Sequence, residues 1–410
     1  MINILWAGMF LSAIVVALYQ LIFLQNYDIF SQITNAIFQN AQSAVEISIG
    51  LIGILSFWLG ILKLIENAHI AEKISQKLTP LFKVLMKDVP SNSPAISTVV
   101  LNMAANFLGL DNAATPMGLK AMEQLQEHNT AKDVASDAQI LFMILNASSV
   151  TLIPITIFMY RAQMGAAHPT DVFIPILLAT SVSTLTGFLL VAIRQKINLA
   201  DRTLLKWLCG FVLLILALTL LFLNLAPAQR LALSSALGNI ILILLLGSII
   251  YISLKNKIKC YEVFVDGAKE GFSIAFNILP YLLAMLVAIG VFRASGILDI
   301  IVDGIKTLCS WLHIDTQFAD ALPTAFMKPL SGSGARAMMI ETMQTFGPDS
   351  FAAFASSVIQ GSTETTFYVL TVYFGAINIS KTRYALKYAL LSDLAGILAA
   401  IGFAYMFYSN

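Results

Sequence analysis

Nine stretches of about 20 predominantly apolar residues limit the fold of this chain more than any other feature of its sequence. A helix needs about 20 residues to cross the hydrocarbon core of a bilayer. In lipid a crossing segment has to satisfy all of its backbone hydrogen bonds, which leaves only helices and closed barrels. The predicted spans are 2–24, 45–65, 138–160, 172–193, 204–223, 231–254, 273–291, 350–374 and 384–407. The sequence therefore predicts an all-α integral membrane protein.

Composition supports a membrane location and argues against several classes of function. The 410 residues are 58% hydrophobic and 11% charged, whereas soluble domains are about 25% charged. A net charge of +1 without a long basic run argues against nucleic acid as a partner. The three cysteines and four histidines lack ligand spacing, so we expect neither a metal site nor a cofactor. The sequence carries no nucleophile–base pattern, which argues against an enzyme.

Two further apolar regions are broken, and their pieces are too short to cross a bilayer. Region 93–127 is broken at Asp111-Asn112 and at Pro116, and region 320–345 is broken at Lys328-Pro329 and at the glycine-rich segment 331–334. We predict two re-entrant helical hairpins that enter the bilayer and return on the same side. Breaks of this kind are tolerated at membrane depth only where protein or water satisfies the freed backbone groups.

The distribution of basic residues predicts the orientation. Lys and Arg gather after the second, fourth, sixth and eighth predicted spans, and the alternate loops hold almost none. If both broken regions are re-entrant, every basic loop lies on the cytoplasmic side. We therefore predict a multi-pass protein of the bacterial inner membrane, with the amino terminus inside and the carboxyl terminus outside. The first span lacks a basic start and a cleavage site, so we expect it to be retained.

The chain also contains a weak internal repeat. DNAATPMGLKAME at 111–123 resembles SGSGARAMMIE at 331–341, and NASSVTLIP at 146–154 resembles QGSTETTFY at 360–368. An odd number of predicted crossings separates the two copies, so they are predicted to be inverted. Inverted repeats with broken helices are typical of secondary transporters, whose site lies at the repeat interface near the midplane. Three amphipathic stretches are predicted to be interfacial helices: 28–44, 69–86 and 297–312.

Glu364 is the clearest candidate for a functional residue. It lies within a predicted span, where a charged side chain costs roughly 2.5–3.5 kcal/mol on insertion scales. We expect it to face protein or water, with Arg336 as its partner and with Gln360 and Thr363 as polar neighbours. The alternative is a structural ion pair or a hydrogen bond that joins two helices. Asp393, in the last span, is a second candidate for coupling a proton or ion, or else a lock between helices.

The other polar candidates lie in the first repeat and at the hairpin tips. Asn146, Ser148 and Ser149 occupy the region that corresponds to Glu364, and they either bind a solute or pack at a helix interface. At the tips, the start of a half-helix suits a polar or anionic group, and the alternative there is ordinary helix capping. The tip candidates are Asn112, Thr115, Ser331, Ser333 and Arg336.

Several long motifs carry a resemblance to known families. The first half, with NMAANFLGLDNAATPMGLKAMEQL and NASSVTLIPITI, resembles the spore maturation protein A family. The second half, with KPLSGSGARAM and GPDSFAAFASSVIQGSTETTFYVL, resembles the spore maturation protein B family. Both families belong to the nucleoside recognition, or gate, domain group. That group is similar to the cores of concentrative nucleoside transporters and of the ferrous iron transporter.

The resemblance implies a division of the chain and a place for the site. It implies a unit at 1–200 that resembles protein A, linking helices at 201–257 and a unit at 258–410 that resembles protein B. The solute would lie between two polar sets. The first is Asn112, Thr115, Asn146, Ser148 and Ser149, and the second is Ser331, Ser333, Gln360, Thr363 and Glu364. Signatures for nucleoside or iron binding are not matched residue by residue, so neither is predicted as the solute.

We therefore predict an inverted repeat of two gate-type units with about nine transmembrane helices, two re-entrant hairpins and interfacial helices. The predicted function is secondary transport of a small polar or charged solute, with a proton or sodium as a coupling ion. The alternative is a non-transporting membrane scaffold in envelope or spore maturation. The expected partners are the solute, the lipid bilayer and, as a homo-oligomer, further copies of the chain.

Overall fold

A computed structural model describes residues 2–107, 111–148 and 152–408, and the side chains of residues 2 and 111–113 are left out of this description. The described residues are helices joined by short connections. The helices are α1 (Ile2–Phe23), α2 (Ile29–Asn67), α3 (Ile70–Leu85), α4 (Pro94–Phe107), α5 (Asp111–Glu127), α6 (Asp137–Ser148), α7 (Ile155–Gln163), α8 (Phe173–Arg194), α9 (Arg202–Leu223), α10 (Pro227–Lys255), α11 (Cys260–Ala294), α12 (Ile297–Trp311), η1 (Gln317–Ala321), α13 (Leu322–Met327), α14 (Gly332–Phe346), α15 (Phe351–Ser362), α16 (Thr366–Ala376) and α17 (Ala385–Tyr408).

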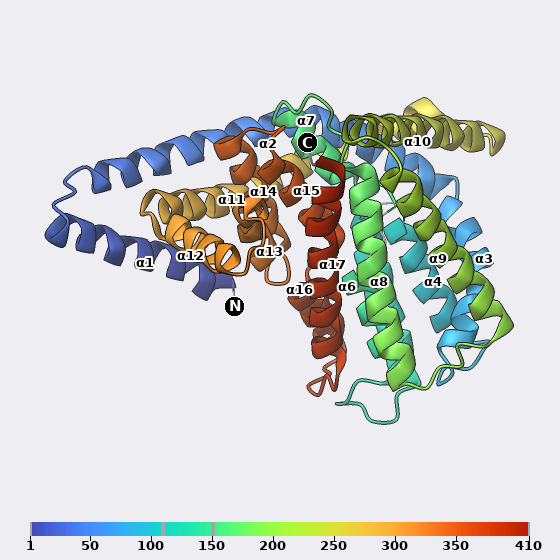
Figure 1. Ribbon diagram of the computed structural model, residues 1–410. Helices are drawn as coiled ribbons and strands as arrows, with labels where there is room; N and C mark the ends of the chain where they lie inside the picture. The colour runs from blue at the N-terminus through green and yellow to red at the C-terminus, as the bar shows by residue number, and fades with distance from the viewer. Residues whose placement is uncertain (1, 108–110, 149–151, 409–410) are drawn as a thin grey trace. The chain divides into compact units, whose positions relative to one another are not determined.

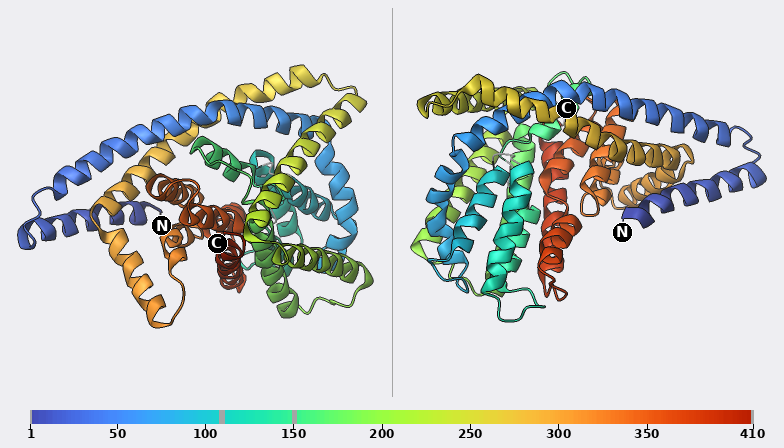
Figure 2. Two further views of the ribbon diagram at one scale, coloured as in Figure 1. Left: turned by 45° about the horizontal axis from the view of Figure 1, so that its top comes forward. Right: turned by 180° about the vertical axis from the view of Figure 1, so that it is seen from behind.

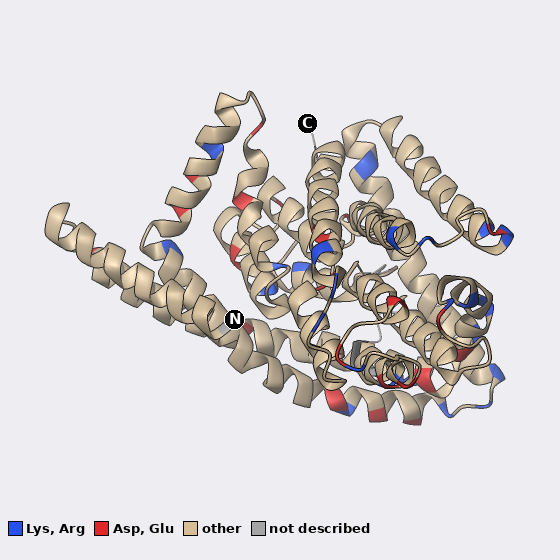
Figure 3. Cartoon of the chain, turned by 90° about the horizontal axis from the view of Figure 1, so that it is seen from below, with Lys and Arg blue, Asp and Glu red and all other residues tan. Residues whose placement is uncertain are grey.

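Among the described residues, seven helices are long and apolar enough to cross a membrane. They are α1, α2, α8, α9, α10, α11 and α17, and each covers one of the predicted spans to within one residue. Figure 3 shows that most of the helical ribbon carries no charged residue. An uncharged helical surface suits lipid, because charged groups are costly within the hydrocarbon region.

The other two predicted spans are not continuous helices, which corrects the prediction of about nine unbroken crossings. Span 138–160 is divided into α6 and α7, and span 350–374 is divided into α15 and α16. Pro154 precedes the first turn of α7, where its missing N–H costs nothing. Three β-branched threonines at 363, 365 and 366 lower the helix propensity there, and Thr365 precedes α16 in an extended conformation without a side-chain capping bond. In the first run the described break, 152–154, ends with Pro154, and in the second run the break coincides with the threonine-rich segment.

Both broken regions consist of helical pieces, as predicted. The first region forms α4 and α5, which pack against each other. The predicted break at Pro116 is wrong, because this proline lies inside α5, within the first two turns. The second forms η1, α13 and α14, and α13 packs on α14. We refer to them as the α4–α5 hairpin and the α13–α14 hairpin.

The amphipathic stretches differ in outcome. Stretch 69–86 forms α3 and stretch 297–312 forms α12, close to the predicted bounds. Stretch 28–44 is not a separate interfacial helix, because it continues into the second predicted span as the 39-residue helix α2. Both views of Figure 2 show α2 as one long unbroken helix. No helix-breaking residue separates the two stretches, so the backbone hydrogen bonds of α2 continue from the first stretch into the second.

The chain divides into two compact units. The first unit comprises Met1–Gly60, Ile157–Pro169 and Val265–Gln360, and the second comprises Ile61–Thr156, Thr170–Phe264 and Gly361–Asn410. Each unit takes segments from both halves of the sequence. The units follow contacts rather than sequence, and the division at residues 200 and 257 stays a prediction.

The second unit is built around the pair α8 and α17, which lie side by side (Figure 1). Small residues allow this approach, as in many membrane helix pairs. Ser183 Oγ donates to the Ser392 carbonyl at 3.0 Å, and Ser392 Oγ donates to the Ser183 carbonyl at 2.6 Å. Helix α6 packs against both helices. Its side chains contribute to the main apolar core of this unit.

The first unit has a smaller apolar cluster formed by α1, α2 and α11. Ala13 and Ala17 of α1, Ile29 and Ile33 of α2, and Val291 of α11 are buried together. Two side chains of α1 also hydrogen-bond backbone carbonyls of the α11 region: Trp6 Nε1 to Ala284 at 3.0 Å and Gln20 Nε2 to Ser295 at 2.8 Å.

Candidate functional site

The α4–α5 hairpin presents two asparagines on one face of α4. Asn102 and Asn106 are four residues apart, which places them on neighbouring turns. Asn102 is fully buried, and its Nδ2 donates to the carbonyl of Ala114 in α5 at 2.7 Å. Asn106 Nδ2 donates to Oδ1 of Asn146 in α6 at 2.7 Å. The first amide joins the two helices of the hairpin, and the second joins the hairpin to α6.

Tyr373 of α16 completes this group of polar side chains. Its hydroxyl donates to Asn146 Oδ1 at 3.2 Å and accepts from Asn102 Nδ2 at 3.4 Å. Its ring stacks on that of Phe142, with centroids 5.4 Å apart and planes 8° from parallel. A Cβ atom at Gly118 would lie 2.2 Å from the Tyr373 hydroxyl, so only glycine leaves room for it. We call Asn102, Asn106, Asn146 and Tyr373 the asparagine–tyrosine cluster.

The cluster is neutral and largely enclosed. Asn146 is 4% exposed, and its Nδ2 donates to the Phe142 carbonyl at 2.9 Å. Amides and a phenol can each donate and accept hydrogen bonds. A buried cluster of polar side chains is stable only while its groups are paired, because a buried polar group without a partner costs about 1–3 kcal/mol. Groups of this kind have the donors and acceptors that a polar solute requires.

The interruption between α15 and α16 lies beside the end of α6. The backbone N–H of Glu364 donates to the carbonyl of Ala147 at 2.8 Å. The carbonyl of Ser148 accepts from the hydroxyls of Thr180 and Thr184 in α8, each at 3.3 Å. The last carbonyls of any helix lack intrahelical partners. Here the second interrupted helix and α8 supply those partners.

The side chains at 363–366 differ in exposure. Glu364 is exposed, whereas Thr363 is 3% exposed and Thr366 is fully buried. Neither threonine hydroxyl oxygen has a hydrogen-bond partner among the described residues. The unwound segment thus offers a carboxylate and two hydroxyls close to the end of α6. The predicted pair of Glu364 with Arg336 stays a prediction, since the two residues belong to different compact units.

The other predicted residues of the second unit are placed as follows. Thr115 is half-buried in the first turns of α5, and the hydroxyl of Ser148, at the end of α6, donates to the Leu145 carbonyl at 3.3 Å. Asn112 lies in α5, but its side chain is outside the described residues, as is all of Ser149. Asp393 is 1% exposed within α17, which packs on α8.

In the first unit the glycine-rich break is a helix cap. Ser331 is the N-cap of α14, and its Oγ accepts from the Gly334 N–H at 3.0 Å. The hydroxyls of Ser331 and Ser333 are 3.2 Å apart. A Cβ atom at Gly334 would lie 2.3 Å from Met327 Cε, so this glycine makes room for a methionine. The sequence left helix capping open as a role at this tip, and the structure shows Ser331 as the cap. Its role in binding a solute stays a prediction.

Two more predicted residues lie in the first unit. The guanidinium of Arg336 lies over the Tyr160 ring, 5.5 Å from its centroid, a favourable cation–π geometry. Gln360 is 8% exposed, and its Oε1 has no hydrogen-bond partner among the described residues. The structure therefore brings Asn146 and Ser148 close to the interruption at Glu364, and it leaves Ser331, Ser333, Arg336 and Gln360 in the other unit.

Sequence reasoning missed Asn102, Asn106 and Tyr373. A signal existed for the two asparagines, because they stand four residues apart in the apolar piece NMAANF. Tyr373 lies among aromatic and β-branched residues of α16, where nothing in its spacing marks it. No group of three or more His, Cys, Asp or Glu among the described residues could hold a metal ion.

Comparison with known proteins relates the chain to one family. A family model described as Gate, nucleoside recognition, matches residues 48–163 and 275–380, more than half of the chain. Spore maturation protein B of Bacillus subtilis (strain 168) is 50% identical over 159 residues, which are 39% of this chain and 87% of that protein. Spore maturation protein A of the same strain is 36% identical over 183 residues, which are 45% of this chain and 90% of that protein.

No solved structure matches this chain. The two relatives are each covered over most of their length, and the family model takes in both α4–α6 and α14–α16. The chain is thus a multi-pass membrane protein that belongs to the Gate family, described as nucleoside recognition, and is homologous to spore maturation proteins A and B.

Proposed function

We propose that the chain is a secondary carrier that binds a small polar solute at the asparagine–tyrosine cluster. One observation carries the proposal: a buried neutral cluster joins the α4–α5 hairpin to halves of both interrupted helices. Helices broken at membrane depth are tolerated where they line a cavity, and carriers use them to form the solute site. Glu364, exposed in the unwound segment, binds the coupling proton or sodium ion in this proposal.

The composition of the compact units supports an inverted repeat. The second unit contains the α4–α5 hairpin, α6 and α16, and the first contains the α13–α14 hairpin, α15 and most of α7. Each unit thus combines a hairpin, the first half-helix that follows it, and the second half-helix of the other repeat. Two copies of one folding unit that exchange their second half-helices produce this composition. In this arrangement both hairpins are re-entrant, as carriers with inverted repeats require.

We further propose the inner membrane of a bacterium as the location, with the amino terminus in the cytoplasm. The basic loops support this orientation. Both relatives come from a bacterium, which supports a bacterial membrane as the location.

Transport into vesicles tests the proposal. The full chain is reconstituted into proteoliposomes, and uptake of labelled uridine is measured, because the family is described as nucleoside recognition. A neutral nucleoside offers donors and acceptors to the amides. Asn146→Ala is expected to lower the uptake at least about tenfold, since it removes a central partner of the cluster. Glu364→Gln is expected to remove the dependence on a proton or sodium gradient.

The control is Asn198→Ala, which alters a loop turn where Asn198 Oδ1 accepts from the Ala200 N–H. It is expected to transport like the unaltered chain. Uptake that is indifferent to both Asn146→Ala and Glu364→Gln contradicts the proposed site.

A non-transporting scaffold is the second candidate, and the names of the relatives favour it. Both relatives are named for spore maturation, which is a process of the cell rather than a solute. If the chain is a scaffold, the variants Asn146→Ala and Glu364→Gln still complement a deletion strain. If it is a carrier, they do not. Complementation by both variants, together with no uptake of uridine, establishes the scaffold instead.

A further inference from the structure

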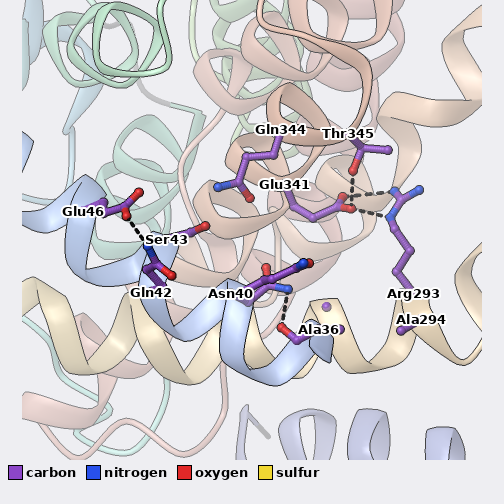
Figure 4. Close-up of a pocket in the computed structure, with 12 residues that line it drawn as sticks. Ala36, Asn40, Gln42, Ser43, Glu46, Arg293, Ala294, Glu341, Gln344 and Thr345 are labelled. Carbon is purple, nitrogen blue, oxygen red and sulfur yellow. Dashed lines mark hydrogen bonds and ion pairs between the residues drawn. The ribbon is translucent and has the colours of Figure 1, made fainter. Parts of the chain in front are cut away.

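The first unit contains a cavity of about 540 Å³ between α2, α11 and α14 (Figure 4). Sites for small molecules have volumes of roughly 300–1,000 Å³. Most such sites are apolar, but nine of the twelve residues that line this one carry an amide, a hydroxyl or a charge. These nine are Gln39, Asn40, Gln42, Ser43 and Glu46 of α2, Arg293 of α11, and Glu341, Gln344 and Thr345 of α14. None of them belongs to the asparagine–tyrosine cluster.

The polar wall of the cavity follows from the sequence of α2. Gln39, Gln42 and Glu46 are three and four residues apart, so they share one face of the helix. The same helix continues into an apolar crossing segment. A polar face on a membrane helix has to meet protein or a water-filled space, and here it meets the cavity.

The one guanidinium in the wall is already neutralised. Arg293 Nη2 donates to Glu341 Oε2 at 3.0 Å, and Arg293 Nε is paired with Glu341 Oε1. Arg293 Nη1 lies 3.4 Å from Asp299 Oδ1, and the group lies over the Phe346 ring, 5.6 Å from its centroid. Figure 4 shows the Arg293–Glu341 pair and the bond from Thr345 to Glu341. Arg293 therefore offers no free charge to an anion.

Glu46 carries the uncompensated charge. Its Oε1 accepts from Gln42 Nε2 at 2.7 Å, and it forms no ion pair among the described residues. With three carboxylates, Glu46, Glu341 and Asp299, and one guanidinium, the formal charge of these groups at the cavity is negative. A negative field in a partly enclosed site attracts cations and repels anions.

We propose that this cavity binds a small hydroxylated organic cation of the amino-sugar class. Its ammonium group lies at the Glu46 carboxylate, because an ammonium offers three donors and a carboxylate only acceptors. Its hydroxyl groups hydrogen-bond the amides of Gln39 and Gln344 and the hydroxyl of Ser43. The site is separate from the transport site proposed above and does not depend on transport.

Three sugars of nearly equal size and different charge test the proposal: glucosamine, glucose and glucuronate. Binding of each to the full chain in detergent is measured by isothermal titration calorimetry. Glucosamine is expected to bind more tightly than glucose, and glucuronate not to bind. Glu46→Gln is expected to weaken glucosamine about tenfold and to leave glucose unchanged, because a charge-assisted hydrogen bond becomes a neutral one.

Glu66→Gln is the matched control, because Glu66 lies at the other end of α2 and pairs with Lys63 at 3.5 Å. It is expected to bind all three sugars like the unaltered chain. Ser43→Phe fills the cavity and is expected to abolish binding of glucosamine and glucose, and its thermal unfolding reports whether the variant is folded.

Several outcomes overturn the proposal. It fails if glucuronate binds as tightly as glucosamine, if none of the sugars binds at millimolar concentration, or if Glu46→Gln leaves glucosamine affinity unchanged. It also fails if Asn106→Ala abolishes glucosamine binding and Glu46→Gln does not, since the sugar then occupies the asparagine–tyrosine cluster. Loss of uridine uptake in Asn106→Ala with unchanged glucosamine binding separates the two sites.

Discussion

The α4–α5 hairpin and the α13–α14 hairpin occupy corresponding places in the sequence repeat, yet different chemistry holds them. The second helix of each carries a glutamate at the end of the repeated motif, Glu123 in α5 and Glu341 in α14. Glu123 is exposed, whereas Glu341 is buried and paired with Arg293 of α11. The α4–α5 hairpin is joined to its neighbours by neutral amides and a tyrosine instead.

This difference suggests a division of roles between the hairpins. Neutral hydrogen bonds can be exchanged for those of a solute at small net cost, because each contributes only about 1 kcal/mol. A buried ion pair cannot be opened so easily, since one partner left alone costs about 3–5 kcal/mol. The α13–α14 hairpin is therefore expected to be the fixed one, and the α4–α5 hairpin the one that responds to solute.

Breaking the ion pair tests the fixed hairpin and has the largest expected effect. Arg293→Ala leaves the Glu341 carboxylate buried without its cation, and we expect the free energy of unfolding to fall by about 3–5 kcal/mol. Reversible unfolding in mixed micelles measures it. The double variant Arg293→Met with Glu341→Met is expected to recover most of the loss. If the single variant is as stable as the unaltered chain, the pair does not hold the hairpin.

A methyl group added to each hairpin compares the rigidity of their contacts. Gly118→Ala places a Cβ 2.2 Å from the Tyr373 hydroxyl, and we expect a loss of about 1–3 kcal/mol of unfolding free energy. Gly334→Ala meets the flexible end of Met327 at 2.3 Å. The methionine can turn away, and alanine gains about 1 kcal/mol of helix propensity, so little net change is expected. If Gly334→Ala loses more unfolding free energy than Gly118→Ala in the same micelles, the result contradicts this account.

Removing one hydroxyl tests the hydrogen bonds that Tyr373 contributes to the cluster. Tyr373→Phe keeps the ring stacked on Phe142 but deletes the bond to Asn146 and the longer bond from Asn102, so we expect a loss of about 1–2 kcal/mol of unfolding free energy. Tyr27→Phe is the control, because Tyr27 is 75% exposed. A loss as large as that of Arg293→Ala would show that the cluster is as rigid as the ion pair, and would end the distinction between the hairpins.

The smallest expected effect lies in the loops of the second unit. Lys381 Nζ lies 2.9 Å from Asp133 Oδ2, and this hydrogen bond and charge lower the pKa of Asp133 below its usual value. A lowered pKa in the folded state adds stability above the unfolded pKa, and that stability is lost as pH falls through the folded pKa. Lys381→Met is therefore expected to lower the melting temperature slightly at pH 7 and not at pH 3. An equal difference at both pH values rules out the ion pair as the cause.

The apolar runs made most of the fold predictable. Seven predicted spans are continuous helices, and the regions broken at Asp111 and Pro329 form pairs of helices, because run length and helix breakers report directly on backbone hydrogen bonding. The breaks at 152–154 and 363–365 were not predicted. Hydropathy averages over a window and does not show where polar residues unwind a helix inside it.

The candidate site was predictable only in part. Asn146 and Glu364 attract notice as polar residues in apolar runs, and the structure places the Glu364 backbone beside the end of α6. Asn102, Asn106 and Tyr373 were missed, because a neutral side chain gives a weaker signal than a charge, and their meeting depends on helix packing. Arg336 was expected beside Glu364 because the sequence repeat places its hairpin next to that helix; this pair stays a prediction, and in the first unit Arg336 lies over the Tyr160 ring.

The mixed origin of the compact units has a consequence for how the chain is assembled. Strand-like pairing of Val134 with Lys381, the Ser183–Ser392 bonds and the Glu364–Ala147 bond all connect the two halves of the sequence within the second unit. Neither half therefore finishes a compact body from its own residues. Cleavage of the backbone in the turn at 256–259 is expected to yield two fragments that copurify as a non-covalent complex. A fragment that is made alone in a cell is expected to be degraded, because the other fragment is not there to complete the compact units.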